Sequence, residues 1–123
     1  MWSYNDELYH YGVLGMKWKH HKTKKAVDKY SKKAQRQVDA NINSAKHVKK
    51  ILDSNYDQIT EQHLTKDDRK QYMYEYRRSI DNAKKWMAAK KDIMNIKISD
   101  ISAKDVKNRF KNYSNKLDYM PFA

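Results

Sequence analysis

A dense run of basic side chains is the part of this sequence with the most evident chemistry. Residues 17–36 contain nine Lys and Arg, interrupted by Asp28 alone, in a chain of 123 residues with a net charge of +12. Such a field favours nucleic acid, an anionic membrane surface or an acidic protein as the partner. Lysine contacts to phosphate do not depend on base sequence. We therefore assign sequence-independent nucleic-acid or other anion contact to Lys24, Lys25, Lys29, Lys32, Lys33 and Arg36.

A second basic cluster also contains aromatic residues. The segment YMYEYRR, residues 72–78, places Tyr74 close to Arg77 and Arg78. Aromatic rings stack on bases while guanidinium groups hold phosphates. Both arginines therefore join the candidate anion contacts, and Tyr74 is a candidate for base stacking. The alternative is that the flanking tyrosines belong to the core and that Tyr74 is a plain surface residue.

Catalytic and metal-binding chemistry has little support in this sequence. The chain has no cysteine, which excludes disulfides and thiolate metal sites. Its five histidines share no spacing typical of zinc ligands. No nucleophile elbow and no glycine-rich phosphate loop is recognisable. We expect a non-enzymatic protein with no catalytic residues, no bound metal and no cofactor.

Both glycines of the chain lie in one short stretch, YHYGVLGMKWKHHK, residues 9–22. Because glycine tolerates positive φ, Gly12 and Gly15 predict two sharp changes of chain direction. Such bends would gather four apolar side chains into a compact knob, namely Val13, Leu14, Met16 and Trp18. Tryptophan is a frequent interface anchor. The knob would either dock on a partner or fold back as a lid over the protein's own helices, and the sequence leaves both open.

This stretch resembles a short motif of tailed-bacteriophage and prophage proteins, roughly His-x-Gly-Val/Ile-x-Gly-Met/Gln-Lys-Trp-Gly. The matching residues are His10, Gly12, Val13, Gly15, Met16, Lys17 and Trp18. The last glycine of the motif is replaced here by Lys19. The motif lies near chain ends of proteins encoded with head, portal and other virion-morphogenesis genes. The resemblance is limited to residues 10–18, and it implies a virion context in which these seven residues and Leu14 form a partner-docking arm.

Long helices must position these residues, because two glycines and one proline in 123 residues leave little room for turns. Apolar residues spaced by three or four from Val27 to Leu52 predict a helix over about 23–56, with Thr23 as its N-cap. A capping box, Thr65 to Asp68, predicts a second helix over about 66–95. Its apolar stripe is assigned to Tyr72, Tyr76, Ile80, Ala83, Met87 and Met94, widened by Met73, Trp86 and Ile93.

A further capping box, Ser102 to Asp105, predicts a short third helix over about 103–116. Residues 95–102 are expected to form an extended linker, and the apolar tail after residue 116 to dock within the protein or on a partner. The predicted fold class is all-α, a long antiparallel helical hairpin plus a short C-terminal helix, with an irregular N-terminal arm. The arm covers residues 1–22 and the helical domain covers residues 23–123.

Together these features predict a small basic phage protein, virion-associated or an assembly factor. Its arm would dock on a capsid or portal component while its basic face lies near packaged DNA. One alternative is a phage-encoded inhibitor of host defence, of the anti-CRISPR type, with the basic helix on guide RNA or in a nucleic-acid channel of the effector. A second is an accessory protein that binds DNA without specificity. No signal peptide and no membrane span is recognisable, so we expect the virion or the host cytoplasm, and an oligomer is compatible.

Overall fold

The computed structural model describes the backbone of residues 4–57 and 59–120 and the side chains of residues 18–56 and 59–120. Its elements, in chain order, are α1 (Tyr4–Ser54), β1 (Tyr56–Asp57), β2 (Gln62–His63), α2 (Lys66–Met94) and α3 (Ala103–Lys116). The predicted all-α hairpin with a short C-terminal helix is confirmed, and the last two helices lie within a residue of their predicted bounds.

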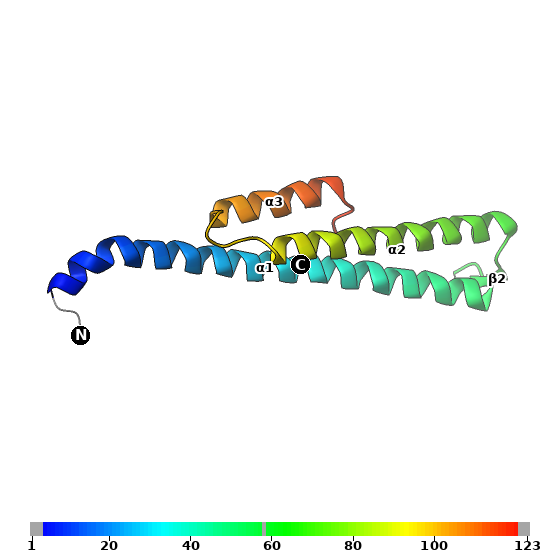
Figure 1. The fold of residues 1–123 in the computed structure, drawn as a ribbon. Coiled ribbons are helices and arrows are strands. Elements are labelled where there is room, and N and C mark those ends of the chain that lie inside the picture. Colours follow the sequence, from blue (N-terminus) through cyan, green and yellow to red (C-terminus); the bar gives the residue numbers. More distant parts are fainter. Residues whose placement is uncertain (1–3, 58, 121–123) are drawn as a thin grey trace.

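Helices α1 and α2 pack side by side as an antiparallel pair (Figure 1). Two side-chain hydrogen bonds fix their register. Asn82 donates to the Asn41 amide oxygen at 3.0 Å, and Lys90 donates to the Gln35 amide oxygen at 2.7 Å. Because α1 is much longer, its N-terminal part continues past the end of α2 (Figure 1). Helix α3 lies against the hairpin and contacts both long helices.

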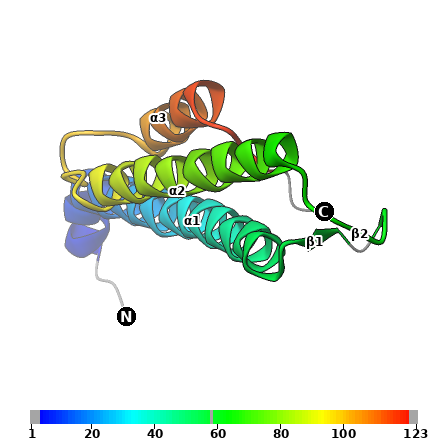
Figure 2. The ribbon, with the colours of Figure 1, turned by 90° about the vertical axis from the view of Figure 1, so that its right-hand side faces the viewer.

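Two very short strands join α1 to α2 at one end of the hairpin (Figure 2). They pair antiparallel, with Tyr56 opposite His63. Asn55, directly after α1, has φ 53° and donates its N–H to the Ile51 carbonyl at 3.0 Å. This is a left-handed helix end, which asparagine tolerates better than most residues. The sequence predicts a turn here but not the strand pairing.

Capping boxes begin α2 and α3, as predicted. The Thr65 hydroxyl accepts from the Asp68 N–H at 3.1 Å, while the Thr65 N–H donates to the Asp68 carboxylate at 3.2 Å. Ser102 and Asp105 make the same reciprocal pair, and the Ser102 hydroxyl also donates to the carboxylate at 2.9 Å. Hydrogen bonds from Ser102 therefore lower the pKa of Asp105.

The expected irregular arm is wrong for residues 4–22, because α1 begins at Tyr4. Both glycines lie inside α1, so the two sharp bends are absent; glycine adopts negative φ as readily as positive φ. Thr23, the expected N-cap, is fully buried within the helix. Its hydroxyl is 2.9 Å from the Lys19 carbonyl and 3.2 Å from the Ile101 carbonyl. The side chain therefore bonds back along the helix, a contact that threonine can make inside a helix.

The core lies where all three helices meet. The first predicted stripe is confirmed, since Val27, Tyr30, Ala34 and Val38 are buried there. The second stripe is confirmed in part: Ala83, Trp86 and Ile93 are buried, whereas Met87 and Met94 are 52% and 56% exposed. The residues of α2 that enter the core are Trp86, Ala89 and Ile93, which pack with Val106 and Phe110 of α3. Helix α3 covers the side of α2 that carries Trp86, the side chain with most apolar area to bury.

Candidate nucleic-acid interface

A row of exposed cations follows α1 on the side away from the core. Its members are separated by three or four residues, so they lie on one helix face. We call this row the basic ridge, and it consists of Lys22, Lys25, Lys29, Lys32 and Arg36. At 1.5 Å per residue it is about 21 Å long. The ridge can therefore meet several phosphates in succession along a nucleic-acid backbone.

The ridge cations are not neutralised by the residues that the structure describes. None of the ion pairs among the described residues involves a side chain of the ridge. The ammonium groups of Lys29 and Lys33 lie 5.5 and 5.3 Å from the centroid of the Tyr30 ring. This cation–π contact orients two neighbouring ammonium groups without cancelling their charge. Both ammonium groups keep their positive charge and can donate to an anionic partner.

Four of the six basic residues predicted on this helix belong to the ridge. The other two, Lys24 and Lys33, lie on opposite flanks of it by helical geometry, and Lys33 is half-buried. Sequence reasoning missed Lys22, because it placed the helix start at Thr23. The three-and-four spacing of the cations, continued one step backwards, would have included it.

The second predicted cluster lies elsewhere on the molecule. Since Asn82 of α2 bonds to Asn41 of α1, Arg77 and Arg78 lie closer than Asn82 to the strand end of the hairpin, away from the ridge. Arg78 donates from Nε to the Asp118 carboxylate at 2.9 Å, and this contact raises the pKa of Arg78. Tyr74 is 63% exposed on α2. The structure does not combine Tyr74 and the arginines with the ridge.

Within the resembling motif, the side chain of Trp18 is described and it faces solvent. Trp18 is 56% exposed, and its ring meets the His21 ring edge-on at 6.2 Å between centroids. It precedes Lys22 by four residues and therefore continues the line of the ridge. This tryptophan does not cover the core as a lid would. The side chains of the other arm residues, at positions 10 and 12–17, lie outside the described residues.

Metal-ligating clusters and membrane-spanning helices are both absent from the described residues. Over that part of the chain, no group of three or more His, Asp or Glu is arranged to hold a metal ion. Nor does any helix described there combine the length and apolarity needed to cross a bilayer.

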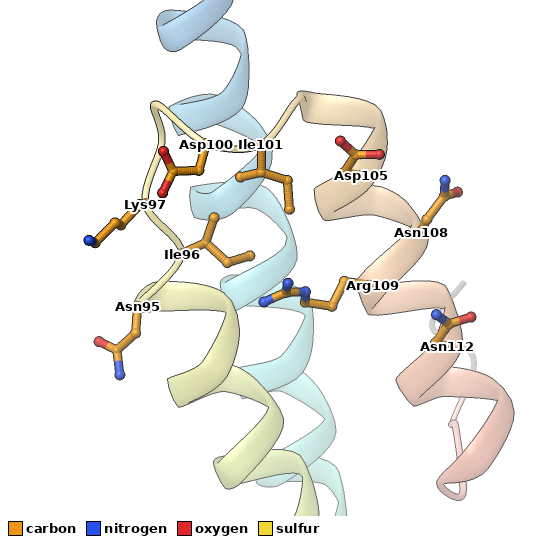
Figure 3. A pocket seen from close by; sticks show the side chains of 9 residues that line it. All are labelled: Asn95, Ile96, Lys97, Asp100, Ile101, Asp105, Asn108, Arg109 and Asn112. Carbon is orange, nitrogen blue, oxygen red and sulfur yellow. The ribbon is translucent and has the colours of Figure 1, made fainter.

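A polar cleft of about 640 Å³ lies between α3 and the linker that follows α2 (Figure 3). Two cations and two acids line it, and none of its nine described lining residues is a histidine or a hydroxyl nucleophile. Arg109 contacts Asp92 at 3.5 Å, and Asp92 also accepts from the Tyr113 hydroxyl at 2.6 Å, which raises the pKa of Tyr113. Of these three residues Arg109 lines the cleft, and it is engaged with Asp92 and Tyr113 in fastening α3 to α2.

The basic ridge and Trp18 thus form one continuous exposed surface on α1. No family model, no curated protein and no solved structure matches this chain. The chemistry of this surface and the resemblance of residues 10–18 are therefore the basis for assigning a function.

Proposed function

We propose that this chain is a small, non-enzymatic bacteriophage protein, a virion component or assembly factor, that lies against nucleic acid through the basic ridge. The ridge is the observation that carries the proposal. It offers five exposed cations on one face of a rigid helix, without an ion pair to any described residue. Each phosphate that such a cation neutralises releases counterions, which supplies affinity without any contact to a base.

The docking half of the proposal rests on the N-terminal motif. The resemblance of residues 10–18 to virion-morphogenesis proteins supports a capsid or portal component as the partner. The exposure of Trp18 favours docking over a lid, because a lid residue would be buried against the helices. An exposed tryptophan beside cations is available to anchor an interface.

An inhibitor of host defence is the second candidate. It is supported by the part of α1 that continues past α2 (Figure 1), since a single helix about 10–12 Å wide can enter a nucleic-acid channel. Mass spectrometry of purified virions separates the two candidates. Presence of the chain at a defined copy number supports the virion role, whereas its absence together with capture of a defence effector supports inhibition.

Salt dependence of duplex binding tests the ridge. If five ridge cations meet phosphates, log Kd should change with log salt at a slope of about 4 to 5 in magnitude, at about 0.9 for each phosphate. The triple variant Lys25→Gln, Lys29→Gln, Lys32→Gln should flatten that slope by about 0.9 for each phosphate that it no longer neutralises. Fluorescence anisotropy with labelled DNA of two unrelated sequences measures both effects.

A matched variant controls for net charge. Lys84→Gln, Lys107→Gln and Lys111→Gln together remove the same charge from exposed positions of α2 and α3. This control should keep nearly the full slope, since its charges lie outside the ridge. Equal flattening in both triple variants, or an affinity that does not change between low and physiological salt, would contradict the ridge as the contact surface.

A further inference from the structure

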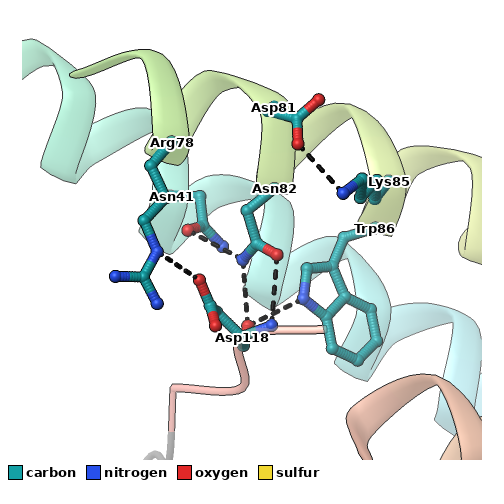
Figure 4. A network of polar contacts seen from close by, with 7 residues as sticks. All are labelled: Asn41, Arg78, Asp81, Asn82, Lys85, Trp86 and Asp118. Carbon is teal, nitrogen blue, oxygen red and sulfur yellow. Dashed lines mark hydrogen bonds and ion pairs between the residues drawn. The ribbon is translucent and has the colours of Figure 1, made fainter. Parts of the chain in front are cut away.

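The segment after α3 is bound to the hairpin through its main chain. The Gln37 amide donates to the Met120 carbonyl and accepts from the Met120 N–H, both at 2.7 Å. The Asn82 amide makes the same two-way contact with Asp118, at 2.9 and 3.2 Å (Figure 4). Two residues spaced by two along the tail are thus recognised in the same way. Two side-chain amides that hydrogen-bond the main chain of every second residue are suited to binding an extended peptide.

The groups that read the tail are themselves buried and held in place. Gln37, Asn41 and Asn82 are 1%, 2% and 5% exposed. Asn41 accepts from Asn82 and donates to the Gln37 main-chain carbonyl at 2.7 Å. The Trp86 indole N–H donates a second hydrogen bond to the Asp118 carbonyl, at 3.0 Å. Buried amides destabilise a core unless they are hydrogen-bonded, and in the folded chain the tail main chain supplies partners for Gln37 and Asn82.

Side-chain recognition involves an acid and the ring that follows it, and Leu117 before them packs against the core. Arg78 holds the Asp118 carboxylate, and both side chains are about half exposed. The Tyr119 ring lies 6.1 Å from Trp86 and 6.3 Å from Phe110 between centroids. A peptide with an acidic residue followed by an aromatic one would keep all of these contacts.

The tail leaves part of the site unfilled. A cavity of about 350 Å³ lies beside Asp118, and Arg78, Lys85 and Lys116 contribute three cations to its lining together with Tyr74. Lys85 also pairs with Asp81 at 3.0 Å (Figure 4). Asp81 and Asp118 also line this cavity and pair with Lys85 and Arg78, so Lys116 is the lining cation that has no ion pair to a described residue. A ligand with one further acidic group beside the position of Asp118 would match this cation.

We propose that this groove, formed by Gln37, Asn82, Trp86 and Arg78, binds an extended acidic-aromatic peptide segment of a partner protein, with residues 117–120 as its displaceable occupant. The amide lining supports exchange. When the tail leaves, exposed amides can hydrogen-bond to water, whereas a purely apolar groove would be driven to close. The main chain of the partner segment would then make the same hydrogen bonds that the tail makes.

A full-length variant with a weakened tail tests the proposal. The probe is a fluorescein-labelled peptide with the sequence of residues 115–123. Asp118→Lys places a like charge opposite Arg78, so the chain's own tail should lose its hold on the groove. In the wild-type chain the tethered tail competes at an effective concentration in the millimolar range. Asp118→Lys should therefore bind the probe about tenfold more tightly, or better, than the wild-type chain.

Matched controls separate the effect of the groove contacts on probe binding from the effect of net charge. Asp100→Lys makes the same change in the exposed linker, away from the groove, and should leave probe binding as in the wild-type chain. Adding Arg78→Glu to Asp118→Lys restores the internal pair with reversed charges and should abolish the gain. A probe with Lys in place of its Asp should bind Asp118→Lys at least tenfold more weakly. If the folded variant binds both probes equally, or if duplex DNA displaces the probe, the peptide assignment is overturned.

Hydrogen exchange on the wild-type chain provides a second test that needs no variant. The N–H groups of Asp118 and Met120 should exchange at least tenfold faster than those of Ala89 and Ile93 in the core, because the tail opens while the hairpin stays folded. Exchange of the tail at the same rate as the core would mean that it leaves only on global unfolding. That result would overturn displacement, whatever the variants do.

Discussion

Two tryptophans of this protein lie in opposite environments. Trp18 is 56% exposed on α1, whereas Trp86 is fully buried and donates its indole N–H to the Asp118 carbonyl. We predict that Trp86→Ala lowers the free energy of unfolding by about 3–5 kcal/mol, as loss of a large core side chain does. Trp18→Ala should leave the melting temperature nearly unchanged. Calorimetry on both variants measures the contrast.

The same Trp18 variant tests docking. If Trp18 anchors an interface, its loss should weaken partner binding by about 2 kcal/mol or more while helicity stays constant. Incorporation of tagged protein into virions gives the readout, with wild-type chain as the reference. A large drop in the melting temperature of Trp18→Ala, or unchanged incorporation, would count against an exposed anchor.

At the scale of elements, substitution of the two glycines of α1 distinguishes a helical N-terminal segment from a bent one. In a helix interior, glycine is about 1 kcal/mol less favourable than alanine. Gly12→Ala and Gly15→Ala should therefore stabilise α1 and keep or raise the far-UV helical signal, because both lie inside α1. A residue needing positive φ would give the reverse, loss of structure on Cβ addition. A reduced helical signal would contradict a continuous α1 through residues 4–22.

The start of α3 should be sensitive to acid. Hydrogen bonds from Ser102 lower the pKa of Asp105 below its ordinary value of 3.8. A carboxyl whose pKa is lowered by folding contributes stability that is full above its unfolded pKa and is lost as the pH falls through the folded value. The stability of the wild-type chain should therefore fall below about pH 4 in part through this cap. Asp105→Asn should have a shallower decline over that range in urea titrations, and parallel curves would exclude the contribution.

For the whole molecule, two apolar residues of the predicted stripes should respond differently to a buried charge. Val38 is 1% exposed in the core, whereas Ile80 is only half-buried on the edge of α2. Val38→Asp should unfold the protein, because it buries an unpaired charge. Ile80→Asp should be milder, since its carboxylate can reach water. Circular dichroism and thermal melting compare the two; equal unfolding by both would place Ile80 in a buried interface that only an oligomer supplies.

Local sequence signals determined the elements. The capping boxes at Thr65 and Ser102 predicted where α2 and α3 begin, because each acts within four residues and does not depend on the rest of the fold. The apolar spacing from Val27 onwards predicted the buried face of α1, and with it the exposed face that carries the basic ridge. Charge and periodicity along a single helix are enough for such a prediction.

Only the tertiary structure decided what α2 and the tail contact. Helical periodicity permitted two neighbouring faces of α2, and the packing of Phe110 from α3 against Trp86 selected one of them, which left Met87 and Met94 exposed. Likewise, nothing near Arg78 in the sequence predicts its pair with Asp118, forty residues away. The contacts of Gln37 with Met120 span 83 residues. Local pattern carries no information on such pairings, because they depend on how α3 and the tail lie against the hairpin.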